Sequence, residues 1–241
     1  MNLTVHLLPS LMSAPVPAGH VAVLIDILRA STTITHAFAH GVKEVLPCQT
    51  VEAALTRAAL LPERPLLGGE RKAVLIPGFD LDNSPFSYSR ERVSGKSVVF
   101  TTTNGTRVLD QCRDAAEVLV GAFVNRAAVA KRLRNESRPI HIICAGTDGF
   151  LTAEDILFAG ALATDLLPAP ESADVQTQLA IDFWHRHGQN EDEFRTTMMQ
   201  SRGGQNLCML GKVQDIEHAM TQNQFEVVPF WTPDADRFSA S

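Results

Sequence analysis

The chain has 241 residues, of which 45% are hydrophobic and 20% are charged, and its formal net charge at pH 7 is −6. This composition indicates a globular protein and excludes a largely disordered one. The negative charge argues against a broad basic surface for nucleic acid, and only two Trp and one Tyr could stack on bases.

The first two thirds of the chain alternate short apolar runs with helical patterns. Strands are expected over 21–25, 42–48, 97–100, 118–120 and 140–144, and helices over 31–40, 50–61, from 104, over 126–134 and over 152–167. Because these strands are continuous apolar runs rather than alternating ones, the pattern is typical of a parallel sheet covered by helices on both faces. We therefore predict an α/β fold, with layered α/β/α architecture and a mostly parallel or mixed sheet.

The last third of the chain has a different pattern. Residues 171–187 and 191–201 are expected to form amphipathic helices, and Gly203-Gly204 to interrupt the chain. Residues 225–229 are expected to form a late strand, placed at a sheet edge because it ends in proline. No linker is evident, so we expect one domain over 1–241, with two lobes, 1–167 and 168–241, as the alternative.

The sequence also bears on the compartment. Residues 1–17 lack a basic n-region and lead into an apolar run, so a first strand and loop is expected rather than a signal peptide. No apolar stretch has the length of a transmembrane helix. No C-x-x-C pair occurs among Cys48, Cys112, Cys144 and Cys208, which favours reduced thiols in a cytoplasmic protein without a membrane partner. A homo-oligomer is expected on general grounds alone.

The first candidate site lies in the loop after the strand at 21–25. In parallel α/β folds, ligands bind at the carboxyl ends of strands, beside the N-termini of the following helices. This loop contains Asp26 and Arg29, and the hydroxyls of Ser31 and Thr32 are candidate substrate ligands. A carboxylate at the end of an apolar run is costly unless it is paired or binds a cation. The alternatives are an Asp26–Arg29 ion pair and an ordinary hydroxyl helix cap.

The second candidate loop, over 101–107, is rich in hydrogen-bond donors. Its backbone N–H groups and hydroxyls could surround one oxyanion, and its arginine could add a charged contact. The candidate substrate-binding residues are Thr102, Thr103, Asn104, Gly105, Thr106 and Arg107. The alternative is a strand of β-branched residues followed by an Asn-Gly turn.

Three further segments bring acidic or polar residues toward the same edge. Gly68-Gly69-Glu70-Arg71 repeats the pairing of an acid with a base, Asn83 lies in the loop 76–85, and Glu154-Asp155 follows the strand at 140–144. Each has an ordinary alternative, namely a surface loop, a surface turn and a helix-capping pattern. Together, these carboxylates, arginines and hydroxyls are the groups that Mg²⁺ and phosphate require at a site of metal-assisted phosphoryl transfer.

Several familiar catalytic motifs are absent from the sequence. No cysteine is followed by arginine six positions later, as a cysteine phosphatase requires, and Leu28 occupies the second acidic position of a D-x-D loop beginning at Asp26. Gly95-Lys96-Ser97 is similar to the end of a P-loop, but Arg90 stands at the opening glycine position. These three motifs are therefore excluded or given less weight as the basis of the chemistry.

The candidate segments, in their order along the chain, resemble the 2-phosphosulfolactate phosphatase (ComB) family. Residues 25–33, IDILRASTT, are similar to the family segment I-D-x-L-R-A-[ST]-T-T, and residues 101–106, TTTNGT, are similar to its most distinctive string. Further matches lie at 69–71, 77–80, 83–85, 144–147, 154–155 and between 206 and 229. The resemblance spans nearly the whole chain and implies a ComB-like topology.

The resemblance implies a Mg²⁺-dependent phosphatase that converts 2-phospho-3-sulfolactate into 3-sulfolactate and phosphate, a step of coenzyme M biosynthesis where that cofactor is made. On this basis Asp26, Glu70 and Asp155 are candidate Mg²⁺ ligands, and Asp26, Arg29, Glu70 and Arg71 are candidate catalytic residues. The route could use a metal-activated water or a phosphoaspartate on Asp26. The alternatives are a phosphatase of another small phosphorylated hydroxy acid and a non-catalytic anion-binding module.

Overall fold

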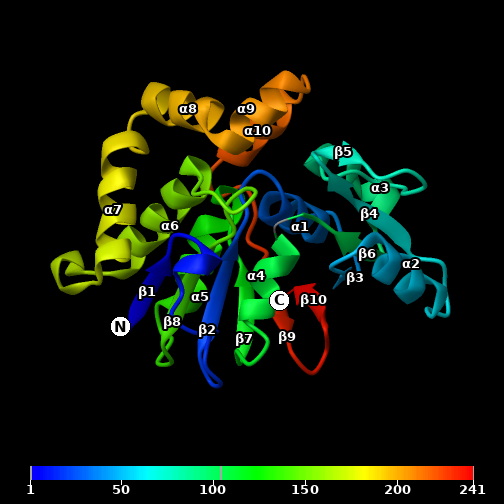
Figure 1. Cartoon of the computed structure of the whole chain (residues 1–241), viewed down its shortest axis with the longest axis horizontal. Coiled ribbons are helices and arrows are strands. Elements are labelled where there is room, and N and C mark those ends of the chain that lie inside the picture. Colours follow the sequence, from blue (N-terminus) through cyan, green and yellow to red (C-terminus); the bar gives the residue numbers. More distant parts are fainter. Residues whose placement is uncertain (1, 104, 241) are drawn as a thin grey trace.

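The computed structural model describes residues 2–103 and 105–240, without the side chains of residues 105–107 and 170. Within this described part, ten strands form one mixed sheet in the order β1-β8-β2-β7-β9-β10-β3-β6-β4-β5 (Figure 1). The α/β class and the mostly parallel, mixed sheet are therefore confirmed. The strands are β1 (Leu3–His6), β2 (Val21–Ile25), β3 (Glu44–Pro47), β4 (Leu66–Arg71), β5 (Val74–Leu75), β6 (Ser97–Thr101), β7 (Glu117–Val120), β8 (Ile140–Cys144), β9 (Pro229–Thr232) and β10 (Arg237–Ala240).

Two parallel blocks make up most of the sheet. One contains β1, β8, β2 and β7, and the other contains β3, β6 and β4. The antiparallel pair β9–β10 joins the blocks, because β9 pairs with β7 and β10 pairs with β3. The short strand β5 pairs antiparallel with β4 at one end of the sheet.

The helices cover both faces of the sheet. They are α1 (Ala30–Ala39), α2 (Val51–Ala59), α3 (Arg90–Val93), α4 (Gly105–Gln111), α5 (Arg126–Leu133), α6 (Ala153–Leu166), α7 (Val175–His187), α8 (Glu191–Gln200), α9 (Arg202–Met209) and α10 (Val213–Met220). Alternate residues of β2 enter two different cores. Val21, Val23 and Ile25 pack into the core shared with α5, α6 and α7, and Ala22 and Leu24 pack into the core shared with α1 and α4. A strand buried on both faces explains its continuous apolar sequence. No helix among the described residues could span a membrane.

The glycine pair before Glu70 lies in a strand, not in a loop as predicted. Gly68-Gly69-Glu70-Arg71 forms the end of β4, where Gly69 pairs with Thr101 of β6. Gly69 has φ +142°, and a Cβ added to it would lie 2.0 Å from the carbonyl oxygen of Thr101. Glycine is thus required by the close approach of two strands rather than by a ligand.

Two predictions for the last third of the chain are also wrong. Gly203-Gly204 does not interrupt the chain, because both residues lie in the first turn of α9, where the Ser201 Oγ accepts a hydrogen bond from the Gly204 N–H at 3.0 Å. The late strand does not cover 225–229 or lie at an edge. β9 begins at Pro229 and lies inside the sheet, since proline is tolerated as the first residue of a strand.

The strand ends define the place of the site. Figure 1 shows α8, α9 and α10 across the top of the view, and the β4–β5 hairpin at the upper right. The carboxyl ends of β2 and β8 meet at one edge of the sheet because both strands run parallel in adjacent positions. The loops that follow these strands therefore converge, as the sequence predicts.

Candidate active site

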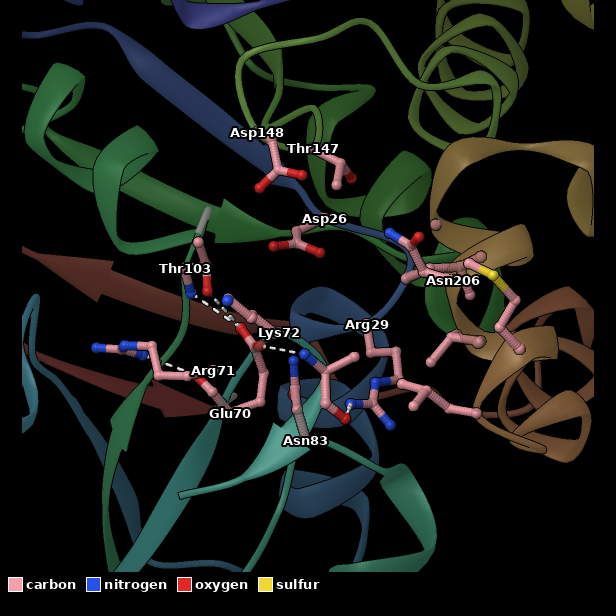
Figure 2. Close-up of a pocket in the computed structure, with 16 residues that line it drawn as sticks. Asp26, Arg29, Glu70, Arg71, Lys72, Asn83, Thr103, Thr147, Asp148 and Asn206 are labelled. Atoms are coloured by element: carbon pink, nitrogen blue, oxygen red, sulfur yellow. Dashed lines mark hydrogen bonds between the residues drawn. The ribbon is translucent and has the colours of Figure 1, made fainter. Parts of the chain in front are cut away.

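A cavity of about 660 Å³ opens at this edge of the sheet (Figure 2). Its wall combines the loops after β2, β5, β6 and β8, the β4–β5 hairpin, and α9 with the residue that follows it. The lining residues are Asp26, Leu28, Arg29, Glu70, Arg71, Lys72, Ala73, Asn83, Thr103, Thr147, Asp148, Gly203, Asn206, Leu207, Met209 and Leu210. The lining contains both acidic and basic side chains, and α9 contributes the apolar side chains of Leu207 and Met209.

Asp26 lies at the floor of the cavity, directly after β2. The residue is 7% exposed. Its carboxylate accepts a hydrogen bond from the Ala30 N–H at 3.3 Å, and its backbone N–H donates to the Ser31 Oγ at 2.7 Å. Burial, together with the negative charges of Asp155 and Glu70, raises the pKa of Asp26 to about 8. Such a carboxylate favours a proton or a nearby cation over an uncompensated charge.

Arg29 does not pair with Asp26, so the ion-pair alternative is excluded. Its Nη1 donates to Asp215 Oδ2 at 2.7 Å, and its Nη2 donates to the carbonyl oxygen of Ala73 at 3.1 Å. The second oxygen of Asp215 accepts a hydrogen bond from the Ser84 Oγ at 2.7 Å. Arg29 is 3% exposed and Asp215 is 1% exposed, so two residues far apart in the sequence form a buried ion pair. The Leu28–Arg29 peptide bond is cis.

Glu70 joins two loops of the cavity wall. Its Oε1 accepts hydrogen bonds from the N–H and the Oγ1 of Thr103, both at 3.0 Å, and its Oε2 accepts one from the Ala73 N–H at 2.8 Å. Figure 2 shows these three bonds from the end of β4 to the two loops. Both carboxylate oxygens are therefore engaged by protein donors, and Glu70 fixes the shape of the cavity.

Several predicted residues have contacts away from the cavity. Ser31 bonds within its own loop, and the Thr32 Oγ1 donates to the carbonyl oxygen of Ile27 at 2.9 Å. Thr102 is buried and is not part of the cavity lining. Arg71 lines the cavity, but its guanidinium points away from Asp26 in Figure 2. That guanidinium donates to the carbonyl oxygens of Glu70 and Gln49 and to the Thr101 Oγ1.

Asp155 lies behind Asp26 rather than in the cavity lining. Its two oxygens accept hydrogen bonds from the Ile27 and Gly146 N–H groups, each at 2.9 Å. Burial raises the pKa of Asp155 and of the neighbouring Glu154 to about 7 each. These acids affect one another electrostatically, yet across the described ranges no three His, Cys, Asp or Glu side chains are arranged to hold a metal ion. The predicted set of Asp26, Glu70 and Asp155 is thus not assembled as three ligands.

Part of the predicted oxyanion loop is not described. Asn104 lies outside the described residues, and for Gly105, Thr106 and Arg107 only the start of α4 is defined. Their contacts with substrate stay predictions. Asn83, in contrast, lines the cavity as predicted, and its buried Oδ1 is an acceptor without a hydrogen-bond partner in the described part of the chain.

Ten of the sixteen lining residues are not among the site residues predicted from the sequence. Gly203, Asn206 and Leu207 come from α9, the helix that the glycine pair concealed, and Asp148 comes from the loop after β8. Lys72 was also missed, although its charge directly follows the Glu70-Arg71 pair that was singled out. The charge pattern itself was a signal for Lys72. For α9 the sequence contained two signals, the serine cap before the glycines and the family resemblance that begins at Asn206.

The fold and the cavity define a class of protein: a layered α/β protein with a charged cavity beside strand ends, the place where enzymes of this architecture bind small molecules. Residues 7–234 match the family model described as 2-phosphosulpholactate phosphatase. The chain belongs to this family, and the resemblance seen in the sequence is confirmed.

Three relatives illustrate the similarity, and each is named a probable 2-phosphosulfolactate phosphatase. The protein of Clostridium perfringens (strain SM101 / Type A) is 38% identical over 213 residues, covering 87% of this chain and 85% of that relative. The protein of Symbiobacterium thermophilum is 38% identical over 220 residues, covering 89% and 92%. The protein of Thermotoga maritima is 36% identical over 214 residues, covering 86% and 87%.

Proposed function

We propose that this chain is a phosphatase that hydrolyses 2-phospho-3-sulfolactate to 3-sulfolactate and phosphate. The observation that carries the proposal is that Asp26 and Arg29, both buried, line the same cavity in a chain of this family. The substrate carries a phosphate, a carboxylate and a sulfonate, and a cavity of about 660 Å³ can enclose a molecule of this size.

Arg29 is suited to bind the phosphate. Its guanidinium has five N–H donors, and Asp215 and the Ala73 carbonyl oxygen accept from two of them. Arg29 is one of the residues that line the cavity. A guanidinium fixed by a buried carboxylate is preorganised, so it can stabilise charge on a phosphoryl group without first reorienting.

We further propose that Mg²⁺ assists the reaction, with Asp26 as its protein carboxylate ligand. The groups present fit such an ion. Asp26 has a single acceptor contact and a raised pKa, and the Asn83 Oδ1 is a second oxygen without a donor in the described part of the wall. Mg²⁺ commonly uses one or two carboxylates and fills its other positions with water and substrate phosphate. When bound, it would neutralise charge on the phosphoryl group.

Asp26 could also act directly as a nucleophile on phosphorus. In that route its carboxylate oxygen forms the new P–O bond while the bond to the substrate alkoxide breaks, and water later releases phosphate from the acyl phosphate. Rapid acid quench of the wild-type protein with ³²P-labelled substrate separates the routes. An acid-stable label lost in Asp26→Asn supports the covalent route, and its absence during turnover supports direct attack by water.

Phosphate release tests the function itself. We expect the purified protein with Mg²⁺ to release phosphate from 2-phospho-3-sulfolactate faster than from phospholactate or phosphoglycolate, and to lose this activity with EDTA and in Asp26→Ala. A preference for one of the other two substrates would assign a different phosphorylated hydroxy acid. No release from any of the three would indicate an anion-binding module instead of an enzyme.

A further inference from the structure

The tip of the β4–β5 hairpin has a sequence that does not suit its backbone. Arg71 pairs with Val74 across the hairpin, so the turn consists of Lys72 and Ala73 alone. Both have positive φ angles, 54° and 60°. Two-residue turns with this geometry favour Asn-Gly, because a Cβ disfavours the left-handed region. The chain therefore places a lysine where local preference would place asparagine or glycine.

The turn is fastened to the cavity wall by two buried groups. Glu70 accepts a hydrogen bond from the Ala73 N–H at 2.8 Å, and Arg29 donates to the Ala73 carbonyl oxygen at 3.1 Å. Both polar groups of one peptide residue are thus bonded to side chains of the candidate site. These contacts hold an unfavourable turn in place and fix the position from which Lys72 extends.

Lys72 places a positive charge at the cavity that is not part of an ion pair among the described residues. Figure 2 shows its side chain in the cavity, on the same side as Thr103 and Glu70. The ion pairs found within residues 2–103 and 105–240 do not include Lys72. The other two lining cations are bound to protein acceptors, Arg29 to Asp215 and Arg71 to backbone and hydroxyl oxygens.

The depth of these groups separates two binding regions. Asp26 and Arg29 are buried at the floor, whereas Lys72 is exposed at the rim. A substrate whose phosphate reaches the floor must direct its other substituents toward the rim. A flexible ammonium there can contact an anionic substituent without the fixed geometry of a guanidinium.

We propose that the Lys72–Ala73 turn is a selectivity element, in which the Lys72 ammonium binds the non-reacting sulfonate or carboxylate of a phosphorylated hydroxy acid. This inference rests on the proposed phosphatase function and extends it to the choice of substrate. It assigns Lys72 to recognition of a second anionic group, while the reacting phosphate belongs to Asp26 and Arg29.

Paired substrates test the selectivity directly. One substrate is 2-phospho-3-sulfolactate, and the other is p-nitrophenyl phosphate, which lacks a second anionic group. We expect Lys72→Gln to lower the ratio of their kcat/KM values at least tenfold, mainly through a higher KM for the first substrate. Lys72→Arg should keep most of the ratio, and Lys131→Gln, which removes an exposed lysine of α5, should leave it unchanged.

A second variant separates recognition from folding. Lys72→Asn/Ala73→Gly gives the turn its preferred sequence, so we expect a melting temperature at or above that of the wild type together with the same loss of ratio. A ratio that stays within twofold of the wild type in both Lys72→Gln and the double variant overturns the inference. Equal losses on both substrates also overturn it, because Lys72 would then act on the phosphate. If the wild type releases no phosphate from either substrate, the proposed function fails and the inference fails with it.

Discussion

The buried ion pair between Arg29 and Asp215 makes a strong prediction about stability. Asp215→Ala removes the carboxylate that lies 2.7 Å from the Arg29 guanidinium, and the two side chains are 0% and 2% exposed. The substitution leaves a buried positive charge without its partner and the Ser84 hydroxyl without its acceptor. Breaking a buried pair in this way typically costs about 3–5 kcal/mol of the free energy of unfolding.

This cost converts into a measurable shift of the melting temperature. In a chain of this size, 1 kcal/mol corresponds to roughly 2–4 °C, so Asp215→Ala should melt about 10 °C below the wild type. Differential scanning calorimetry and urea unfolding measure the change. Glu217→Ala on the same helix is the matched control, because it breaks an exposed ion pair with Arg195 and should cost less than about 1 kcal/mol.

A double variant identifies the source of the cost. Arg29→Met/Asp215→Leu removes both charges and fills a similar volume, so it should recover most of the lost stability while abolishing phosphate release. If this double variant is no more stable than Asp215→Ala, the cost does not come from an unpaired charge. If Asp215→Ala melts within the range of Glu217→Ala, the pair has no structural importance and the reasoning is wrong.

Three further predictions follow from the backbone and from histidine burial. Gly69→Ala should destabilise the protein by about 3 kcal/mol or more in urea unfolding, because its new Cβ would lie 2.0 Å from the Thr101 carbonyl oxygen. Lys72→Asn/Ala73→Gly should raise the free energy of unfolding by about 1–2 kcal/mol, since it relieves two left-handed residues. The pKa of His36 is lowered to about 3, mainly by burial and further by His40 and His218. Because the unfolded chain then binds the proton more readily, His36 should reduce stability by at most about 1.4 kcal/mol per pH unit as the pH falls from about 6.5 toward 3.

Each of these predictions has a control. Gly78→Ala tests whether a positive φ alone explains the destabilisation by Gly69→Ala, because Gly78 also has a positive φ but nothing lies within 4 Å of a Cβ there. Gly78→Ala should lower the free energy of unfolding by less than Gly69→Ala does. For the third, His36→Gln should flatten the fall of melting temperature between pH 6.5 and 5, whereas His185→Gln at an exposed position of α7 should not. An unchanged slope in His36→Gln, or a double turn variant that melts below the wild type, would contradict the respective argument.

The sequence predicts the fold wherever local and tertiary preferences agree. The apolar run of β2 is a strand because it is buried on both faces, and the Thr50 Oγ1 caps α2 through the Ala53 N–H as expected. Prediction from the sequence fails where a tertiary contact overrides local preference. Gly69 reads as a loop residue, but it lies in a strand because β6 passes too closely for any side chain.

The candidate site could be predicted in its position but only partly in its contacts. Parallel strands place Asp26 beside the loop after β8, and Glu70 beside Thr103, as a sequence pattern can indicate. The block of β4 and β6 runs opposite to the block of β2 and β8, so a sequence pattern does not indicate that the two groups line one cavity. Which acid pairs with which base depends on chain segments far apart in sequence. Arg29 lies three residues from Asp26 and yet pairs with Asp215, because α10 brings a buried carboxylate within 2.7 Å of the guanidinium.

Three residues that depart from local preference line the same cavity. Asp26 is a buried acid with a raised pKa, and Lys72 occupies a turn that favours asparagine or glycine. Gly203 lies in a helix, where a Cβ added to it would be 2.2 Å from the Glu154 Oε1. Each of these choices lowers the stability of the fold. Natural sequences retain such conflicts mainly where function requires them. Because Asp26, Lys72 and Gly203 come from three separate segments and all line the same cavity, their shared location is itself an argument that this cavity is the active site.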